Sequence, residues 1–125
     1  MPETPEAPYA FQKRNAGPEE ILVEGGGVKV WADGARARDA HLLEMKYVEK
    51  PETSPFIEGS SCNEVVRVAI REKKLNQLKR YAEIIRDPTT PAAGLEIVVN
   101  EGRAVSYFES LMRDLDIPGR VVVGR

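Results

Sequence analysis

Three charged residues between residues 28 and 48 have types and spacing that suit phosphate chemistry. Glu44 and Lys46 are two residues apart, and Asp33 lies upstream of them. Two carboxylates a few ångströms apart repel one another unless a cation lies between them, and hard oxygen ligands suit Mg²⁺ or Mn²⁺. A metal held in this way polarises a phosphoryl oxygen and lowers the pKa of its bound water. Lys46 would then orient the attacking water or stabilise charge developing on phosphorus.

Two neighbouring strands must position these side chains. The runs 28–33 and 41–48 are rich in Val, Leu and aromatic residues, and a Gly-led connection separates them, so they predict an antiparallel hairpin. Side chains alternate faces along a strand, which puts Glu44 and Lys46 on one face. The hairpin partner then brings Asp33, at the end of the first strand, close to Glu44.

Three further carboxylates are candidates for the same metal. Asp39 rivals Asp33 because it is nearer to Glu44 in sequence, although Asp is common in turns for other reasons. Glu20 and Glu24 lie in the run 18–24, where a leading proline and acidic residues near the positive end of the dipole favour a short helix. Either acid could reach the metal from that helix.

A second candidate group lies on a long helix. The segment from residue 61 to residue 87 contains no Gly or Pro, opens with a capping box and carries apolar residues at helical spacing, so it predicts one amphipathic helix. Gln77 and Tyr81 are four residues apart and therefore share a face of this helix. Lys79 and Arg80 lie beside them and could hold a nucleic-acid backbone.

Composition bounds the class of protein. With 125 residues, 42% hydrophobic and 30% charged, the chain suits a single globular domain over residues 18–125. Residues 1–17 are rich in proline and predict a flexible tail or linker. A single cysteine excludes an internal disulfide. No run approaches the ~20 apolar residues of a membrane span, and the first residues lack the layout of a signal peptide.

Charge is distributed unevenly along the chain. The net charge of −2 argues against a generally basic surface for nucleic acid, but residues 64–80 hold six basic residues against two acidic ones. Arg36 and Arg38 fall in the turn that we place beside the candidate site. These basic groups predict local contacts with phosphates.

The remaining elements complete an α/β pattern. Residues 95–99 form a nearly unbroken apolar run, which is typical of a central strand. Helical spacing predicts a helix over 103–115, and a turn then leads into an edge strand over 120–123. The order is helix, strand, strand, long helix, strand, helix, strand, which predicts an α/β layer fold.

These patterns resemble the signature of the restriction endonuclease fold toxin 2 domains, nuclease modules of bacterial polymorphic toxins within the PD-(D/E)xK superfamily. The resemblance spans residues 28–124 and rests on 32–34, Asp39, 43–48, Pro51, 54–55, 78–82, 84–88, 94–96 and 107–108.

The resemblance implies a restriction-endonuclease-like fold, with a central mixed four-stranded sheet flanked by helices. It implies that Asp33 and Glu44 bind Mg²⁺ or Mn²⁺ and that Lys46 is the catalytic lysine, although many members carry Asp at the position of Glu44. The pair Gln77 and Tyr81 resembles a Q-x-x-x-Y element that flanks the site in some nucleases of this superfamily, which implies that Gln77 and Tyr81 are additional catalytic residues.

The function implied is a metal-dependent nuclease toxin of interbacterial competition that cleaves nucleic acid, with DNA favoured over RNA. Such a module would be secreted, act in the target-cell cytoplasm and be blocked by a cognate immunity protein. One alternative is a metal-independent RNase with His41 as general base, which is weakened because alternation puts His41 on the face opposite Glu44. Another is a non-catalytic module whose basic helix binds nucleic acid or a protein.

Overall fold

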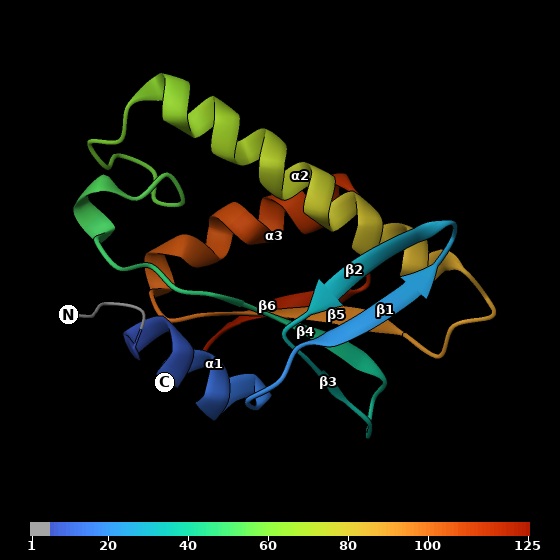
Figure 1. Ribbon diagram of the computed structural model, residues 1–125. Helices are drawn as coiled ribbons and strands as arrows, with labels where there is room; N and C mark the ends of the chain where they lie inside the picture. The colour runs from blue at the N-terminus through green and yellow to red at the C-terminus, as the bar shows by residue number, and fades with distance from the viewer. Residues whose placement is uncertain (1–5) are drawn as a thin grey trace.

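A mixed four-stranded sheet forms the centre of the fold. The computed structural model describes residues 6–125 (Figure 1). The sheet has the order β3-β4-β5-β6, in which β3 is antiparallel to β4 and the other pairs are parallel. The elements in chain order are α1 (Glu6–Ala16), β1 (Ile21–Gly25), β2 (Val28–Ala32), β3 (Gly34–Arg36), β4 (His41–Lys46), the 3₁₀ turn Pro51–Thr53, α2 (Glu64–Arg86), β5 (Gly94–Val99), the 3₁₀ turn Gly102–Ala104, α3 (Val105–Asp114) and β6 (Gly119–Val123).

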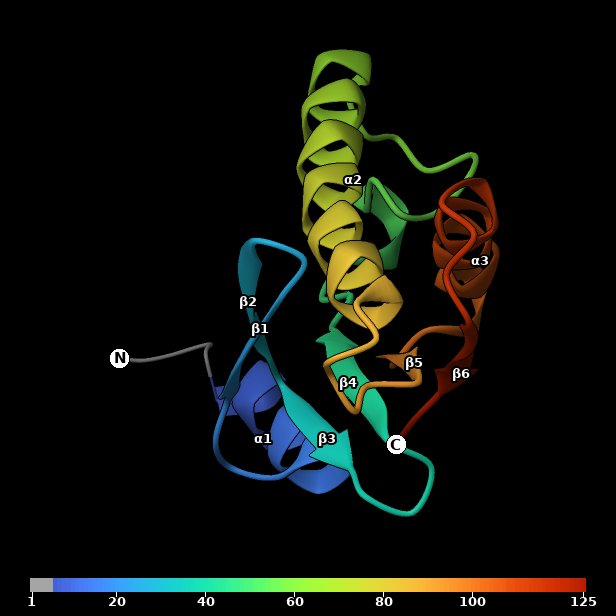
Figure 2. The ribbon, with the colours of Figure 1, turned by 90° about the vertical axis from the view of Figure 1, so that its right-hand side faces the viewer.

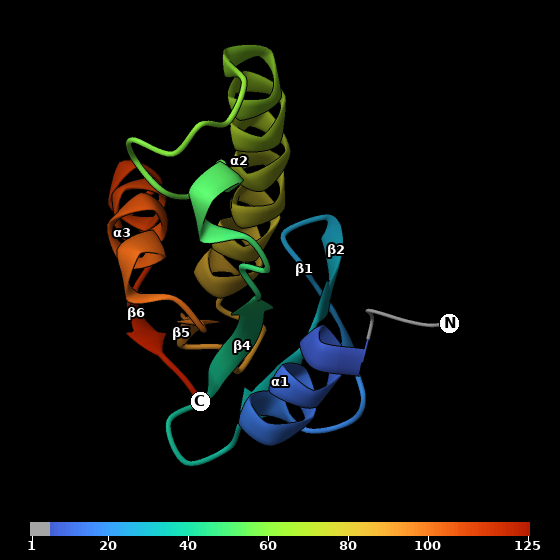
Figure 3. The ribbon, with the colours of Figure 1, turned by 90° about the vertical axis from the view of Figure 1, so that its left-hand side faces the viewer.

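Helices cover both faces of this sheet. Helices α2 and α3 lie over one face and α1 over the other (Figures 1 and 3). Every residue of β5 is buried, as its nearly unbroken apolar run predicts, and β6 lies at the edge. The core on the α2 side contains Leu78, Ile84, Ile97 and Phe108, each of them at most 1% exposed. Each such side chain contributes about 1.5–3 kcal/mol on burial. The α/β fold with a mixed four-stranded sheet is therefore confirmed.

The prediction that residues 28–33 form the hairpin partner of β4 is wrong. Strand β2 pairs with β1 in a separate antiparallel ribbon, and the partner of β4 is instead the short strand β3. The chain passes from one sheet to the other at Asp33, whose backbone N–H still donates to the carbonyl of Leu43 at 3.0 Å. The connection that closes the hairpin is therefore residues 37–40.

A glycine turn explains why residues 21–25 form a strand and not the predicted helix. Gly26 and Gly27 have φ values of +57° and +82°, the left-handed conformation that a two-residue hairpin turn requires. The N–H of Gly26 donates to the carboxylate of Asp87 at 2.8 Å, and a Cβ at Gly26 would lie 2.8 Å from the carbonyl oxygen of Glu83. The turn thus holds the ribbon against the carboxyl end of α2 (Figure 2).

Residues 6–16 also differ from the predicted tail. They form helix α1, whose Phe11 is 1% exposed and packs against Tyr47 with 5.6 Å between ring centroids. Pro8 falls in the first turn of α1, where its missing N–H costs little. The prediction for residues 1–5 lies outside the described residues.

The long predicted helix is present as α2, with Asn63 and not Ser61 as its cap. The side chain of Asn63 accepts a hydrogen bond from the N–H of Val65. Within residues 6–125, neither α2 nor any other helix is long and apolar enough to cross a membrane.

Candidate active site

The carboxylate of Glu44 is the centre of a buried polar cluster between β4 and α2. Its Oε1 accepts a hydrogen bond from the hydroxyl of Tyr81 at 2.5 Å. Its Oε2 accepts from the ammonium of Lys46 at 3.0 Å and from the amide of Gln77 at 3.1 Å. Glu44 is 5% exposed, so this is not a solvated strand face. The structure thus brings together four of the five predicted catalytic residues.

Lys46 is held by two acceptors from different elements. Its ammonium donates to Glu44 of the same strand and, at 2.8 Å, to the Oε1 of Gln77 on α2. An ammonium has three N–H donors, so one remains free for another acceptor. Since Lys46 is 8% exposed, two fixed acceptors restrict its position strongly. The alternation of faces predicted for β4 is confirmed.

Asp33 joins the cluster from the bend between β2 and β3. Its Oδ2 accepts from the backbone N–H of Met45 at 2.7 Å, which fixes the carboxylate along β4. Burial, followed by the negative charge of Glu44, raises the pKa of Asp33 from 3.8 to about 6. The two carboxylates therefore repel one another, and Lys46 does not fully compensate them.

Tyr81 is a donor to Glu44 throughout the ordinary pH range. It is fully buried, and its pKa is raised above its usual value of 10, first by burial and then by the charge of Glu44. The phenol therefore keeps its proton. Gln77 bridges Lys46 and Glu44, so both α2 residues orient the strand residues.

Arg36 and Asp39 lie away from this cluster, on the opposite face of the sheet. The guanidinium of Arg36 donates to both oxygens of Glu96, at 3.0 and 2.9 Å, and to Asp39 at 2.8 Å. Hydrogen bonds from Arg36 lower the pKa of Asp39 to about 2. The prediction that Arg36 lies beside the site is thus wrong. Asp39 does not take the place of Asp33, because Asp39 lies with Arg36 on the face opposite Glu44. Arg38 is exposed in that same turn.

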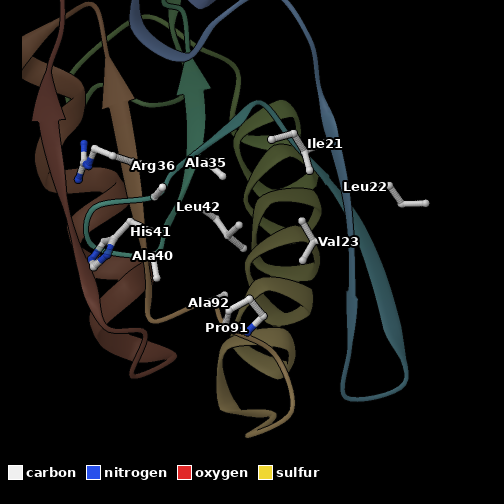
Figure 4. Close-up of a pocket in the computed structure, with 11 residues that line it drawn as sticks. Ile21, Leu22, Val23, Ala35, Arg36, Ala40, His41, Leu42, Pro91 and Ala92 are labelled. Atoms are coloured by element: carbon white, nitrogen blue, oxygen red, sulfur yellow. The ribbon is translucent and has the colours of Figure 1, made fainter.

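His41 lies with the Arg36 group and not with Glu44. Its Nδ1 is 3.0 Å from the carbonyl oxygen of Asp39. A pocket of about 500 Å³ opens beside it, with Arg36 and His41 on one side and β1 residues on the other (Figure 4). The lining is mainly apolar and consists of Ile21, Leu22, Val23, Ala35, Arg36, Ala37, Ala40, His41, Leu42, Pro91 and Ala92. The carboxylate of Asp39 lies 3.7 Å from the Nδ1 of His41 but is bound by Arg36, and the pocket lining contains no hydroxyl or thiol group, so the geometry favours the Glu44 cluster over the RNase alternative.

Glu20 and Glu24 differ in their relation to the cluster. Glu20 is exposed just before β1, and its charge adds to the raised pKa values of Asp33 and Tyr81, so it lies within electrostatic range of both. Glu24 lies within β1 and pairs with Lys29 at 3.6 Å. Neither residue is on a helix, which corrects the expected placement.

Lys79 and Arg80 do not point the same way. Both are exposed on α2. A helix turns about 100° per residue, so Arg80 lies about 60° from Gln77 around the helix, while Lys79 lies about 160° from it. Arg80 is therefore nearer than Lys79 to the side of α2 that carries the cluster, at its border.

Lys74 is a site residue that the sequence reasoning missed. It lies three residues before Gln77 and seven before Tyr81, a spacing that puts all three on one face of α2. Burial, then the neighbouring charge of Lys46, lowers its pKa to about 8. The spacing of Lys74, Gln77 and Tyr81 was visible in the sequence. Lys74 was missed because it is one of six basic residues in the run 64–80.

The donor set suits a hard divalent cation, with only two protein ligands. Among residues 6–125 no group of three or more His, Cys, Asp or Glu side chains is arranged to bind a metal. Asp33 has one carboxylate oxygen without a hydrogen-bond donor from those residues, and burial, followed by the charge of Glu44, raises its pKa. Two carboxylate ligands, with waters in the remaining positions, match the way proteins bind Mg²⁺.

A comparison with protein families gives the chain its assignment. The model of the family described as restriction endonuclease fold toxin 2 matches residues 7–118. No curated protein sequence and no solved structure matches the chain. The family match runs from α1 through α3 and ends just before β6, with Asp33, Glu44 and Lys46 inside it, and its name suggests a nuclease toxin. The chain belongs to the restriction endonuclease fold toxin 2 family.

Proposed function

We propose that this chain is a nuclease toxin that hydrolyses phosphodiester bonds with the help of Mg²⁺ or Mn²⁺, and that DNA is its substrate. The observation that supports this most is the contact of Lys46 and Gln77 with the same oxygen of Glu44, with Asp33 fixed alongside by the backbone of Met45. Family membership agrees with it.

The chain's own residues divide the work. Asp33 and Glu44 would hold the metal, which polarises the phosphate and lowers the pKa of a water when bound. Lys46 presents its remaining N–H to the water or to the charge that develops on phosphorus, at a position fixed by Glu44 and Gln77. Tyr81 keeps the Glu44 carboxylate oriented, because its hydroxyl stays protonated.

The toxin role extends the proposal to its setting. As a module of interbacterial competition, the chain would act in the cytoplasm of a target cell and be neutralised by an immunity protein. Family membership supports this setting. Expression in bacteria tests it: the parent should stop growth, and Lys46→Gln should not.

Cleavage of plasmid DNA tests the enzymatic proposal. We expect Mg²⁺ or Mn²⁺ to support cleavage and EDTA to abolish it, because two carboxylates without a thiol or imidazole select hard cations. A parallel assay with a structured RNA of similar length tests the choice of DNA. Full activity in EDTA would contradict the metal, and faster cleavage of RNA would contradict the substrate.

A further inference from the structure

A second lysine extends the polar cluster along α2. Tyr81 and Gln77 both contact Glu44, and Gln77 also contacts Lys46, so successive turns toward the amino end of α2 follow β4 toward its carboxyl end. Lys74 is the next residue on that face. Figure 3 shows α2 continuing past the carboxyl end of β4, where Lys46 is the last strand residue.

The two ammonium groups are neighbours with unequal partners. Lys46 is paired with Glu44, whereas no hydrogen bond or salt bridge joins Lys74 to a carboxylate among residues 6–125. The pKa of Lys74 is lowered to about 8 by burial and then by the charge of Lys46; Glu44 opposes this shift, and Lys73 on the same helix adds to it. The cations repel, and Lys74 lacks the anion that would stabilise its charge.

An anion between the two lysines would relieve this repulsion. A phosphodiester carries one negative charge and two non-bridging oxygens, so each ammonium can receive one oxygen. Lys46 has one N–H free of protein acceptors, and lysine binds phosphate readily as a compact point charge. The position at the end of β4 is also directly beside the carboxylates.

We propose that Lys74 and Lys46 form a phosphodiester-binding subsite, in which Lys74 of α2 holds a phosphate of the substrate backbone next to Glu44. This rests on the proposed nuclease function for the identity of the ligand. Lys74 makes one phosphate contact, and its contribution is to position the substrate.

Binding of a labelled 20-base-pair DNA duplex in EDTA tests the subsite without cleavage. Lys74→Gln should weaken binding roughly 10-fold at low salt and reduce the slope of log K against log salt by about 1, since one phosphate contact is lost. Lys74→Arg should restore both. Lys13→Gln is the matched control, because Lys13 is exposed on α1 across the sheet, and it should leave the slope unchanged.

The outcomes separate the subsite from the nuclease. If the parent cleaves DNA but Lys74→Gln keeps the slope of Lys13→Gln, the subsite is overturned and the nuclease stands. If no metal supports cleavage but Lys74→Gln loses one unit of slope, the subsite stands without the nuclease. Absence of duplex binding by the parent, or a lowered melting temperature of Lys74→Gln with an unchanged slope, would overturn the subsite.

Discussion

The two faces of the central sheet carry charged clusters built on the same strands but balanced in opposite ways. On the α1 face, Glu96 of β5 accepts from Arg36 and, at 2.8 Å, from Arg120 of β6. These hydrogen bonds, led by those from Arg36, lower the pKa of Glu96 from 4.5 to about 2. On this face the negative charges are fully compensated by arginines.

On the α2 face the balance is reversed. Glu44 is bonded to Lys46, whereas no hydrogen bond or salt bridge joins Asp33 to a cation among residues 6–125, and burial raises the pKa of Asp33 to about 6. A paired network stabilises the fold, whereas a buried carboxylate without a bonded cation costs stability unless a ligand binds it. Groups with such perturbed pKa values gather at functional sites more often than elsewhere. The difference between the faces supports the proposal that the α2 face holds the active site.

Replacing one cation on each face should give the largest contrast. Lys46→Gln should reduce the cleavage rate by on the order of 10² to 10³, about 3–4 kcal/mol of barrier, because the charge facing phosphorus is lost. Arg120→Gln should leave the rate unchanged, since its partner Glu96 is on the other face. Initial rates of plasmid cleavage measure both. Circular dichroism shows whether each variant is folded, and equal rates for the two variants would refute the distinction.

Neutralising one carboxylate on each face should change stability in opposite directions. Asp33→Asn should raise the free energy of unfolding at pH 7.5 by about 1–3 kcal/mol, because it removes the repulsion from Glu44 and keeps an acceptor for the N–H of Met45. Glu96→Gln should lower it by a similar amount, because two arginines lose their shared carboxylate. Urea unfolding in EDTA measures both values. Loss of stability in Asp33→Asn would show that the carboxylates are compensated after all.

The pH dependence of stability should carry the same signature. The folded chain holds the proton of Asp33 up to about pH 6 and the unfolded chain only to about 3.8, so the stability of the parent in EDTA should fall as pH rises between these values. Glu96 acts oppositely: its contribution is present above about pH 4.5 and is lost as pH falls toward 2. Asp33→Asn should abolish the first change and keep the second. Melting temperatures measured from pH 3 to 7 test both expectations. The account would be contradicted if Asp33→Asn kept the first change or lost the second.

The smallest effect concerns the surface of α2. Arg80→Gln should reduce the salt slope of duplex binding by somewhat less than 1, because its exposed side chain lies at the border of the cluster side of the helix. Lys79→Gln should change the slope less, since Lys79 points away by helix geometry. Fluorescence anisotropy at several salt concentrations compares them. A larger loss of slope in Lys79→Gln would place the nucleic acid on another side of α2.

Local patterns predicted the cluster because its geometry follows from two periodicities. Strand alternation placed Glu44 and Lys46 on one face of β4, and helical spacing placed Gln77 and Tyr81 on one face of α2. Their meeting required only that α2 cover β4. The burial of Glu44 and Lys46 could not be predicted in the same way, because it depends on the helix that covers them.

What the sequence could not predict depended on contacts between distant segments. The run 21–25 forms a strand because the glycine turn after it docks on Asp87, sixty-one residues away from Gly26. Arg36 left the predicted site because Glu96, on a strand far along the chain, binds it. Helix α1 was missed because the prolines among residues 1–17 are typical of a tail, although only Pro8 falls within the helix, and because the burial of Phe11 depends on Tyr47.

Thermal unfolding with increasing Mn²⁺ tests most directly whether Asp33 and Glu44 on the α2 face bind a divalent cation. At a hundredfold excess over Kd, binding to the folded state should stabilise the parent by about 2.7 kcal/mol, a rise in Tm on the order of 10 °C. Asp33→Asn, although more stable without metal, should show almost none of this rise, and Glu96→Gln should show all of it. An equal rise in Asp33→Asn and the parent, or no rise in the parent, would contradict the account.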